Sequence, residues 1–251
     1  MPRNSATLPV TGFWFDTARR RRDFAGLILL LSLAIAFPIR TNTTRVGCLV
    51  LAAAAWCMGL LVFRSSKSVR AVLVGVALLV IAVAAIPGRP VDPHRLRGEY
   101  VHALRAYTGV KYVWGGENAL GIDCSGLVRE GMIDATLREG VATLNPSAIR
   151  ESFFLWRHDC SAEQLGLGYG GRTVPLLETP SLTEVDYGKL QPGDIAVTEG
   201  GAHTLAYLGD RTWIEADPGD YAGKVIQVNA SHTRNPWFSV PMQILRWRQL
   251  A

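Results

Sequence analysis

Apolar residues are gathered in three uninterrupted runs near the start of the chain. The runs cover Phe24–Ile39, Val46–Phe63 and Ala71–Ile86, contain no charged residue, and are 16, 18 and 16 residues long. A helix that crosses a bilayer needs about 20 apolar residues, with about 17 at the short end. Flanking residues can extend each run, so the pattern predicts three transmembrane helices within residues 24–88. Three buried core helices are the alternative, which the arginine-rich breaks between the runs disfavour.

The basic residues that flank these runs predict an orientation. Residues 1–23 carry five arginines and the connection 64–70 carries three basic residues, against five on the opposite side of the predicted spans. This bias of eight to five favours a cytoplasmic N-terminus and places everything after Ile86 outside the membrane. Arg19–Arg22 and the first run could also form a cleaved signal peptide. No small-x-small cleavage site follows, so we expect a retained helix.

Charge divides the chain into two parts of opposite sign. Residues 1–97 hold 13 basic and 3 acidic side chains, whereas residues 98–251 hold 13 basic and 18 acidic side chains. The net charge of +5 therefore reflects the arginines around the membrane runs. The acidic balance of the second part argues against a nucleic-acid partner.

Residues 89–97, rich in proline, read as a linker, and a domain is expected over 98–251. A helix is predicted from Gly98 to about Gly109, followed by a strand over Val110–Trp114. Apolar residues then recur at helical spacing from Cys124 to Ala135, which predicts a helix that begins at Cys124 with Asp123 as its N-cap.

The rest of the domain changes from helical to strand patterning. Residues 138–186 have weak periodicity, and we interpret them as an insertion with one or two short helices around Ser147–Trp156. The segments "DIAVT", "HTLAYLG", "TWIEA", "KVIQV" and "VPMQILRW" are short and rich in β-formers, with turn residues between them. They predict an antiparallel meander. Helices followed by strands, without a βαβ rhythm, indicate an α+β fold.

Cys124 is the main candidate for chemistry. A thiol becomes a good nucleophile only when ionised, and the start of a helix favours an anion. Cys48 and Cys57 lie in the second apolar run as small fillers. Cys160 could form a disulfide with Cys124 in an oxidising compartment. No cysteine and histidine spacing is typical of zinc, and neither a metal nor a cofactor is expected.

His203 and Glu215 are the candidates for the base and its orienting group. His203 opens a predicted strand after "EGGA", and Glu215 lies on the next strand. With a strict two-residue turn at Gly209–Asp210, Glu215 would point away from His203. A three-residue connection or one bulge would pair 203 with 215 on one face, and Gly209 suits a bulge. The alternative is that Glu215 is a solvated carboxylate.

The motifs "YVWGGENALGIDCSGLV", "LQPGDIAV", "HTLAYLGD" and "WIEA" resemble, in order, those of the NlpC/P60 cysteine peptidases. The resemblance covers roughly Gly98 to Asp217. It implies a papain-like α+β fold, with the nucleophile at a helix start packed on a small antiparallel sheet. It also implies an enzyme of the bacterial cell wall that cleaves peptidoglycan stem peptides, often between D-γ-glutamate and the diamino acid. The multi-pass anchor would hold it in the cytoplasmic membrane, with lipid around its spans and the catalytic domain on the outer side.

By this resemblance Cys124 is the nucleophile, His203 the general base and Glu215 the third polar residue. Tyr112 matches a tyrosine near the oxyanion site, where it would act with the Cys124 amide. Asp123 and Ser125 match positions that hold the stem peptide in some members. A glutamate stands where histidine, asparagine or glutamine is common. A carboxylate favours the charged imidazolium, so activity is expected to survive this departure.

Three other functions are compatible with the sequence. The first is an amidase or acyltransferase that acts on another amide or ester. The second is a non-catalytic module that binds cell wall, which the presence of Cys124, His203 and Tyr112 disfavours. The third is a function within the three helices, and the lack of charged residues in the apolar runs argues against a transport pathway.

Overall fold

The computed structural model describes residues 11–219 and 221–251, with side chains of the first helix described from Thr17 onward. The predicted basic N-terminus therefore lies in part outside the described residues. The chain divides into two compact units. One contains the helices up to Ala36 and from Thr43 to Ile81, and the other combines the short segment Phe37–Asn42 with Ala82–Ala251.

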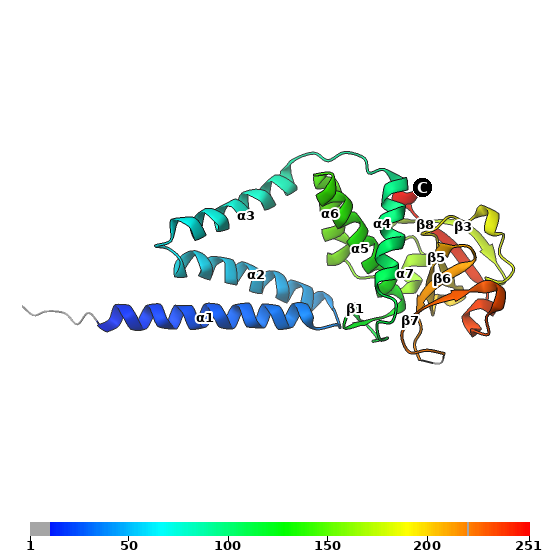
Figure 1. Ribbon diagram of the computed structural model, residues 1–251, viewed down its shortest axis with the longest axis horizontal. Helices are drawn as coiled ribbons and strands as arrows, with labels where there is room; N and C mark the ends of the chain where they lie inside the picture. Colours follow the sequence, from blue (N-terminus) through cyan, green and yellow to red (C-terminus); the bar gives the residue numbers. More distant parts are fainter. Residues whose placement is uncertain (1–10, 220) are drawn as a thin grey trace, which may run out of the picture. The chain divides into compact units, whose positions relative to one another are not determined.

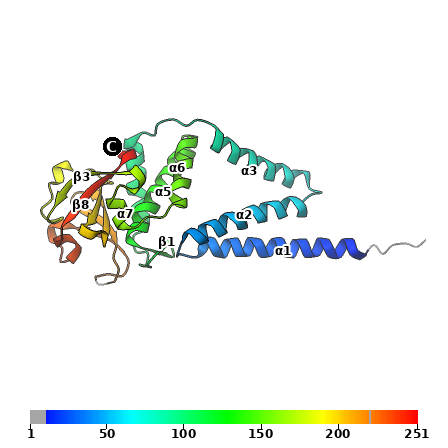
Figure 2. The same cartoon turned by 180° about the vertical axis from the view of Figure 1, so that it is seen from behind.

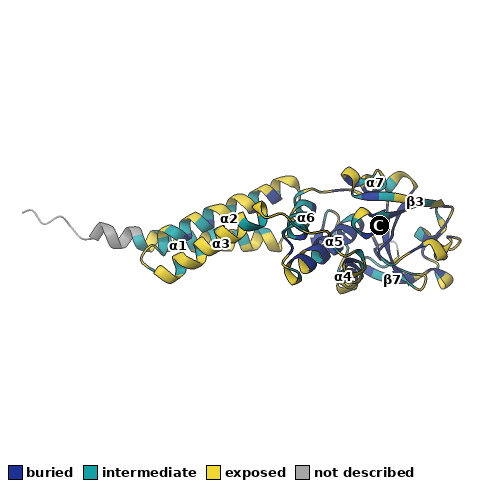
Figure 3. Ribbon diagram, turned by 90° about the horizontal axis from the view of Figure 1, so that it is seen from above, coloured by how far each residue is buried: buried dark blue, intermediate teal, exposed yellow. Residues whose placement is uncertain are grey.

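Three helices follow one another in the first part of the chain: α1 (Thr11–Ala36), α2 (Asn42–Val62) and α3 (Lys67–Ala85) (Figure 1). By length and composition, α2 and α3 are apolar enough to cross a membrane. None of the side chains of α3 is buried, and Figure 3 shows this helix largely in the colour of exposed residues. An exposed apolar helix of this length is unfavourable in water and suited to lipid.

The first helix differs from the prediction of three equivalent spans. Only two described helices meet the criteria for a membrane span. α1 ends at Ala36, because the backbone leaves the helix ahead of Pro38, whereas the predicted apolar run continues to Ile39. The charged stretch Arg19–Asp23 lies inside the same helix. The apolar part of α1 within the helix, residues 24–36, is therefore shorter than a bilayer requires.

The second unit begins with helices where the sequence predicts a linker. α4 spans Pro93–Ala106, and Asp92 caps it by accepting a hydrogen bond from the His94 amide. Leu96 in its first turn is fully buried, so the packed domain starts before Gly98. Upstream, the backbone of Arg89 is held by both ends of the Asn145 side-chain amide. The predicted linker 89–97 is thus mostly structured, since its apolar and polar groups find partners in the domain.

The remaining helices are α5 (Cys124–Ala142), α6 (Pro146–Arg157) and α7 (Ala162–Gly166). Short 3-10 turns are η1 (Tyr169–Gly171), η2 (Tyr187–Lys189), η3 (Glu199–Gly201), η4 (Ala230–His232), η5 (Pro236–Ser239) and η6 (Arg248–Leu250). Helix α5 begins at Cys124, as predicted from the apolar spacing. The two opposite views in Figures 1 and 2 show α4, α5 and α6 together on one side of the sheet.

The main sheet has six antiparallel strands in the order β3-β8-β4-β5-β6-β7. Their bounds are β3 (Thr173–Thr179), β4 (Ile195–Thr198), β5 (Thr204–Gly209), β6 (Thr212–Ala216), β7 (Val225–Asn229) and β8 (Met242–Trp247). β4 to β7 form the predicted meander, and β8 returns to pair with β4 on its other side. The α+β class is confirmed, and a minor hairpin of β1 (Glu117–Asn118) and β2 (Gly121–Ile122) stands apart from this sheet.

One prediction about local structure was wrong, and another was incomplete. Val110–Trp114 forms only isolated bridges, from Lys111 to Lys224 and from Tyr112 to Ile122, because no continuous partner strand lies beside it. The segment 138–186 contains α6, as expected, but also α7 and the edge strand β3. β3 pairs with β8 through a register shift between Pro175 and Leu177, and its proline lies on an edge strand where a missing amide is tolerated.

The sheet separates two apolar clusters. Ile195, Ala206 and Ile214 face the cluster that also contains residues of α4 and α5. Alternate residues such as Leu205 and Trp213 face a second cluster, which the loops around Leu182 and Phe238 cover. Side chains alternate across a strand, so odd-numbered positions of β5 and β6 point to this loop-covered face.

Candidate active site

Cys124 occupies the first position of α5, and Asp123 caps that helix. The Gly126 amide donates a hydrogen bond of 2.6 Å to Oδ1 of Asp123, and the Leu127 amide donates one of 2.9 Å to the Asp123 carbonyl. The amides of Cys124 and Ser125 precede these bonds at the helix start. They are therefore oriented toward the thiol, which places a partial positive charge beside the sulfur.

The glycine pair before this helix is required by close packing. Gly115 has a left-handed φ of 72°, and its amide donates to Oδ2 of Asp123 over 2.8 Å. A Cβ on Gly116 would lie 2.5 Å from the Gly121 carbonyl oxygen, and a Cβ on Gly126 would lie 2.4 Å from the Gly116 carbonyl oxygen. Only glycine lets the loop approach the start of α5 so closely.

The Cys124 thiol is 8% exposed, and its surroundings shift its pKa in both directions. Burial, followed by the charge of Asp123, raises this pKa to about 12, while the amides of Thr204, Ser125 and Cys124 itself oppose the rise. At neutral pH the thiol on its own keeps its proton. A nearby base is therefore needed to produce the nucleophile. The Thr204 amide next to the thiol belongs to the residue that follows His203.

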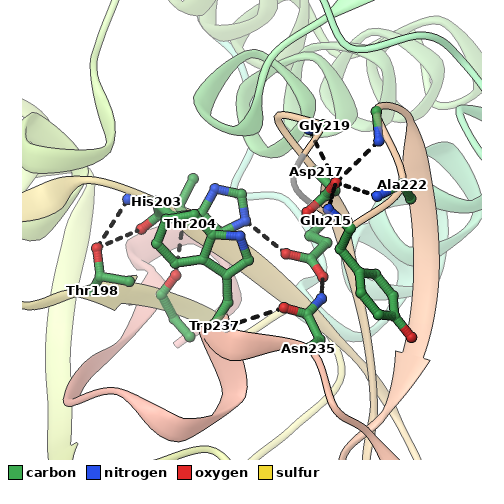
Figure 4. Close-up of polar contacts among 12 residues, drawn as sticks. Thr198, His203, Thr204, Glu215, Asp217, Gly219, Ala222, Asn235 and Trp237 are labelled. Atoms are coloured by element: carbon green, nitrogen blue, oxygen red, sulfur yellow. Dashed lines mark hydrogen bonds and ion pairs between the residues drawn. The ribbon is translucent and has the colours of Figure 1, made fainter.

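His203 and Glu215 form a buried pair. Nε2 of His203 lies 2.7 Å from Oε2 of Glu215, and the two side chains are 1% and 0% exposed (Figure 4). The backbone of His203 is fixed by Thr198, whose Oγ1 accepts the His203 amide over 2.9 Å and whose amide donates to the His203 carbonyl over 3.0 Å. Because Nε2 is engaged, Nδ1 is the ring nitrogen left for proton exchange.

A bulge brings these two side chains to one face of the sheet, as the parity argument predicts. Tyr207 pairs with Trp213 and Gly209 pairs with Thr212, with a register shift between them. The hairpin turn itself is Asp210–Arg211, where both residues have positive φ, rather than Gly209–Asp210. The pairing continues so that Glu215 lies level with Leu205. Leu205, the residue opposite Glu215, lies two positions after His203. Glu215 and His203 are therefore diagonal neighbours across the two strands and not a direct pair.

Two residues of the site were missed from the sequence. The side-chain amide of Asn235 donates to Oε1 of Glu215, and its Oδ1 accepts the Trp237 amide over 3.0 Å. The indole of Trp237 stacks on the His203 ring, with centroids 4.4 Å apart and planes at 22° (Figure 4). Asn235 caps the turn η5, and "NPW" reads in the sequence as a turn signal only. Nothing local connects it to a residue 20 positions earlier.

The pattern of the NlpC/P60 family matches residues 109–242, which is more than half of the chain. The chain belongs to the NlpC/P60 family. It is 26% identical over 147 residues to dipeptidyl-peptidase 6 of Lysinibacillus sphaericus, an alignment that covers 59% of this chain and 41% of the relative. The chain thus spans less than half the length of that curated relative.

Solved structures with similarity include members of the same family. The NlpC/P60 domain of the peptidoglycan hydrolase SagA is 20% identical, with 59% of this chain and 97% of that chain covered and a TM-score of 0.33. The peptidoglycan hydrolase RipB of Mycobacterium tuberculosis is 22% identical, with 64% and 69% covered and a TM-score of 0.36.

Tyr112, Asp123 and Ser125 are the three substrate-binding residues that the family resemblance implies. Burial raises the pKa of the Tyr112 phenol, and the charges of Cys124, Asp123 and Asp217 raise it further, so this hydroxyl lies among the groups of the site. Oγ of Ser125 donates to Oδ1 of Asp123 over 3.1 Å. Both carboxylate oxygens of Asp123 thus hold the loop and the helix start. Substrate binding by Asp123 and Ser125 remains a prediction.

Asp217 orders the loop that follows Glu215. Its Oδ2 accepts the amides of Gly219, Tyr221, Ala222 and Gly223 (Figure 4). Burial alone would raise the pKa of Asp217, but the four amides reverse the effect and lower it. The Gly223 carbonyl in turn accepts the Tyr112 amide over 3.0 Å. The carboxylate therefore fixes the backbone on which Tyr112 stands.

The segment 138–186, which the sequence predicts to be an insertion, contributes to a cavity near the His203 strand. This cavity of about 650 Å³ is lined by α7 and the end of β3 from this segment, by the segment 197–201 before His203, and by residues 241–243 at the start of β8. Thr198, which holds the His203 backbone, is among its lining residues. The segment 138–186 thus forms one wall of a cavity that Thr198 connects to the backbone of His203.

The disulfide alternative is excluded, because Cys124 and Cys160 are both free thiols. Cys160 is buried in the cluster between helices and sheet. Among the described residues, no group of three histidine, cysteine or acidic side chains is arranged to hold a metal ion.

Proposed function

We propose that this protein is a membrane-anchored hydrolase of peptidoglycan stem peptides that uses Cys124, His203 and Glu215. The observation that carries the proposal is the buried His203–Glu215 pair, together with a thiol at a helix start that lies beside the amide of Thr204, the residue after His203. Both NlpC/P60 structures compared above are described as peptidoglycan hydrolases, which supports the same class of substrate. The bond between D-γ-glutamate and the diamino acid is the proposed point of cleavage.

In the proposed first step, Nδ1 of His203 takes the thiol proton and the sulfur attacks the carbonyl carbon of the scissile amide. Glu215 holds the ring and stabilises the imidazolium that forms. The amide of Cys124 and the hydroxyl of Tyr112 stabilise the oxyanion. The C–N bond then breaks, and the imidazolium gives its proton to the leaving amine.

The second half of the reaction releases the acyl group from sulfur. Water attacks the thioester while His203 takes a proton from it, and the C–S bond breaks to give the carboxylic acid product. The thiol regains its proton and the site returns to its starting state. Glu215 acts on the ring in both halves, so it contributes by positioning and charge rather than by bond making.

The proposed anchor rests on a topological argument. Phe37–Asn42, which joins α1 to α2, belongs to the same compact unit as the catalytic residues. It must therefore lie on the same side of the membrane as that unit. Two crossings, by α2 and α3, separate the segment from the catalytic domain and return the chain to one side. The apolar part of α1 is short, and we propose that α1 still makes a third crossing, in which the apolar stems of Arg19–Arg22 extend the span at the membrane surface. The arginine bias then places the catalytic domain outside the cytoplasmic membrane.

The test is digestion of purified muropeptides by the full chain in detergent, with the products identified by mass spectrometry. New amine and carboxyl ends at the D-γ-glutamyl bond, absent with Cys124→Ala, are expected. Cleavage at a different amide, or acyl transfer without hydrolysis, would favour the amidase or acyltransferase alternative. Binding without turnover would indicate a recognition module.

A further inference from the structure

The connector Phe37–Asn42 between α1 and α2 is joined to the loop that precedes the nucleophile. The Arg40 amide donates to the Gly115 carbonyl over 3.1 Å, and the Glu117 amide donates to the Pro38 carbonyl over 3.0 Å. Ile39 and Gly116 thereby form an antiparallel bridge. This is the pairing of a short β-ribbon between segments almost 80 positions apart in sequence.

A side chain reinforces this pairing. Nδ2 of Asn118 donates to the Phe37 carbonyl over 3.2 Å, while its Oδ1 accepts the Leu120 amide over 2.8 Å. Asn118 thus both shapes the β1–β2 hairpin and binds the connector. The two functions use different atoms of the same amide, so they can be separated by substitution.

The same loop binds the start of the nucleophile helix through its other edge. The Gly115 amide donates to Oδ2 of Asp123, and the Gly116 carbonyl accepts the Asp123 amide over 3.0 Å. Gly115 therefore receives the connector on its carbonyl and holds Asp123 with its amide. Asp123 caps α5 one residue before Cys124. A continuous series of backbone contacts leads from the connector to the nucleophile.

Charged groups tie the same three segments together. Glu117 forms a buried ion pair with Arg129, which lies on α5 in the second turn after Cys124. Arg40 of the connector lies close enough to Glu130 that its charge lowers the pKa of that buried carboxyl, against a larger rise caused by burial. The connector is thus linked to α5 in two ways, by the charge of Arg40 acting on Glu130 and by the hydrogen bonds of the loop.

We propose that the connector is a positioning element of the active site, which fixes the Gly115–Glu117 loop and through it the cap and the nucleophile of α5. The catalytic site is then completed by a segment that lies between two helices of the membrane part. This inference rests on the proposed function in one respect only, the measurement of turnover on muropeptides.

Loss of this contact should affect geometry and not folding. The body of α5 is held by Leu127, Val128 and Met132, which are fully buried in the main core. The connector contributes only a few hydrogen bonds, and the net contribution of each to the free energy of unfolding is small. Its removal leaves the loop fixed along one edge instead of two. A displacement of about 1 Å at a nucleophile can reduce a rate by about two orders of magnitude.

The experiment compares Arg40→Pro with Arg40→Gln in the full chain in detergent. Proline removes the amide that binds Gly115, whereas glutamine keeps it and removes only the guanidinium. The first readout needs no substrate: alkylation of Cys124 by iodoacetamide, followed by mass spectrometry of its tryptic peptide, with buried Cys160 as internal reference. The second readout is kcat and KM on muropeptides, and the third is thermal unfolding.

Arg40→Pro should change the alkylation rate of Cys124 and lower kcat by about tenfold. The alkylation rate of Cys160 and the unfolding temperature should stay close to wild type, and Arg40→Gln should have the smaller effect on kcat.

Asn118→Asp gives an independent test, since it keeps the oxygen that accepts the Leu120 amide and loses the donor to the Phe37 carbonyl. It should act in the same direction, and it serves if Arg40→Pro does not fold. Wild-type alkylation and kcat in folded Arg40→Pro or folded Asn118→Asp would overturn the proposal. Altered alkylation in a protein inactive on muropeptides would refute the proposed substrate alone.

Discussion

The nucleophile and the base of this site are built in different ways. Cys124 stands in a local structure: its cap, its glycines and its helix all lie within Gly115–Ala142. His203 lies in a non-local structure, where its partners come from three separate segments: Thr198 from β4, Glu215 from β6, and Asn235 and Trp237 from the turn η5. The local half can be read from its sequence spacing. The other half depends on the register of a sheet and on a loop that covers one of its faces.

The largest expected effect distinguishes the reacting groups from everything that supports them. Cys124→Ala and His203→Ala should each lower turnover of muropeptides by about 10³-fold or more, because the nucleophile and the base act as a unit. Circular dichroism and thermal unfolding should show a folded domain. Cys160→Ala is the matched control and should keep wild-type turnover, and full activity in Cys124→Ala would refute the assignment.

The pH dependence of Cys124 alkylation tests whether the base acts on the nucleophile. The raised pKa of Cys124 means that little thiolate exists at neutral pH unless a base removes the proton. In His203→Ala, alkylation by iodoacetamide should be slow at pH 7 and increase about tenfold for each pH unit up to about pH 10. In wild type the rate at pH 7 should be higher and the slope shallower. Equal profiles would mean that His203 does not act on the thiol.

Replacement of the buried carboxylate should have an intermediate effect. Glu215→Gln keeps the shape and one acceptor but removes the charge that stabilises the imidazolium. We expect turnover to fall by about 10- to 100-fold across the pH–rate profile, because the imidazolium that forms in the reaction loses the charge that stabilises it. An unchanged rate and profile would show that the contact between Glu215 and His203 has no role in the reaction.

Asn235 offers a sharper probe of the non-local half. Asn235→Asp keeps the oxygen that accepts the Trp237 amide, loses the donor to Glu215, and adds a second carboxylate against it. It should lower kcat by about tenfold with little change in KM, whereas Asn235→Ser should lower it less because no like charge is introduced. If Asn235→Asp has wild-type kcat and an unshifted pH profile, the amide has only a structural role.

The smallest effect concerns stability near the local half. Burial raises the pKa of Glu130 on α5 to about 8, against opposing charges of Arg129 and Arg40 and reinforcing charges of Glu117 and Asp134. An unfolded glutamate loses its proton near pH 4.3, so the free energy of unfolding should decline as pH rises from about 4 to 8. Glu130→Gln removes this term and should raise the unfolding temperature at pH 9 by roughly 2–4 °C, with no gain at pH 4. Calorimetry at both pH values is the test, and an equal shift at both would exclude this origin.

The sequence by itself determined the elements whose signal is local. Helix α5 with Cys124 at its start follows from apolar spacing and from an aspartate that caps. The five strands of the second half follow from β-rich segments between turns. The family motifs lie on these elements. Because side chains alternate along a strand, the sequence also indicates that Glu215 can face His203 only if a bulge or a longer turn joins the two strands. The structure has such a bulge before the Asp210–Arg211 turn.

Only the tertiary structure decided which distant segments meet. Whether the bulge exists depends on the pairing of both strands, and β3 is a strand because β8 offers it an edge. Asn235 reaches Glu215, and the connector 37–42 reaches Gly115, through contacts that leave no periodic pattern in the chain. The physical reason is that such contacts satisfy hydrogen-bonding groups that become buried only when the chain has folded. A sequence shows which groups can form them, and the fold alone brings the partners within reach.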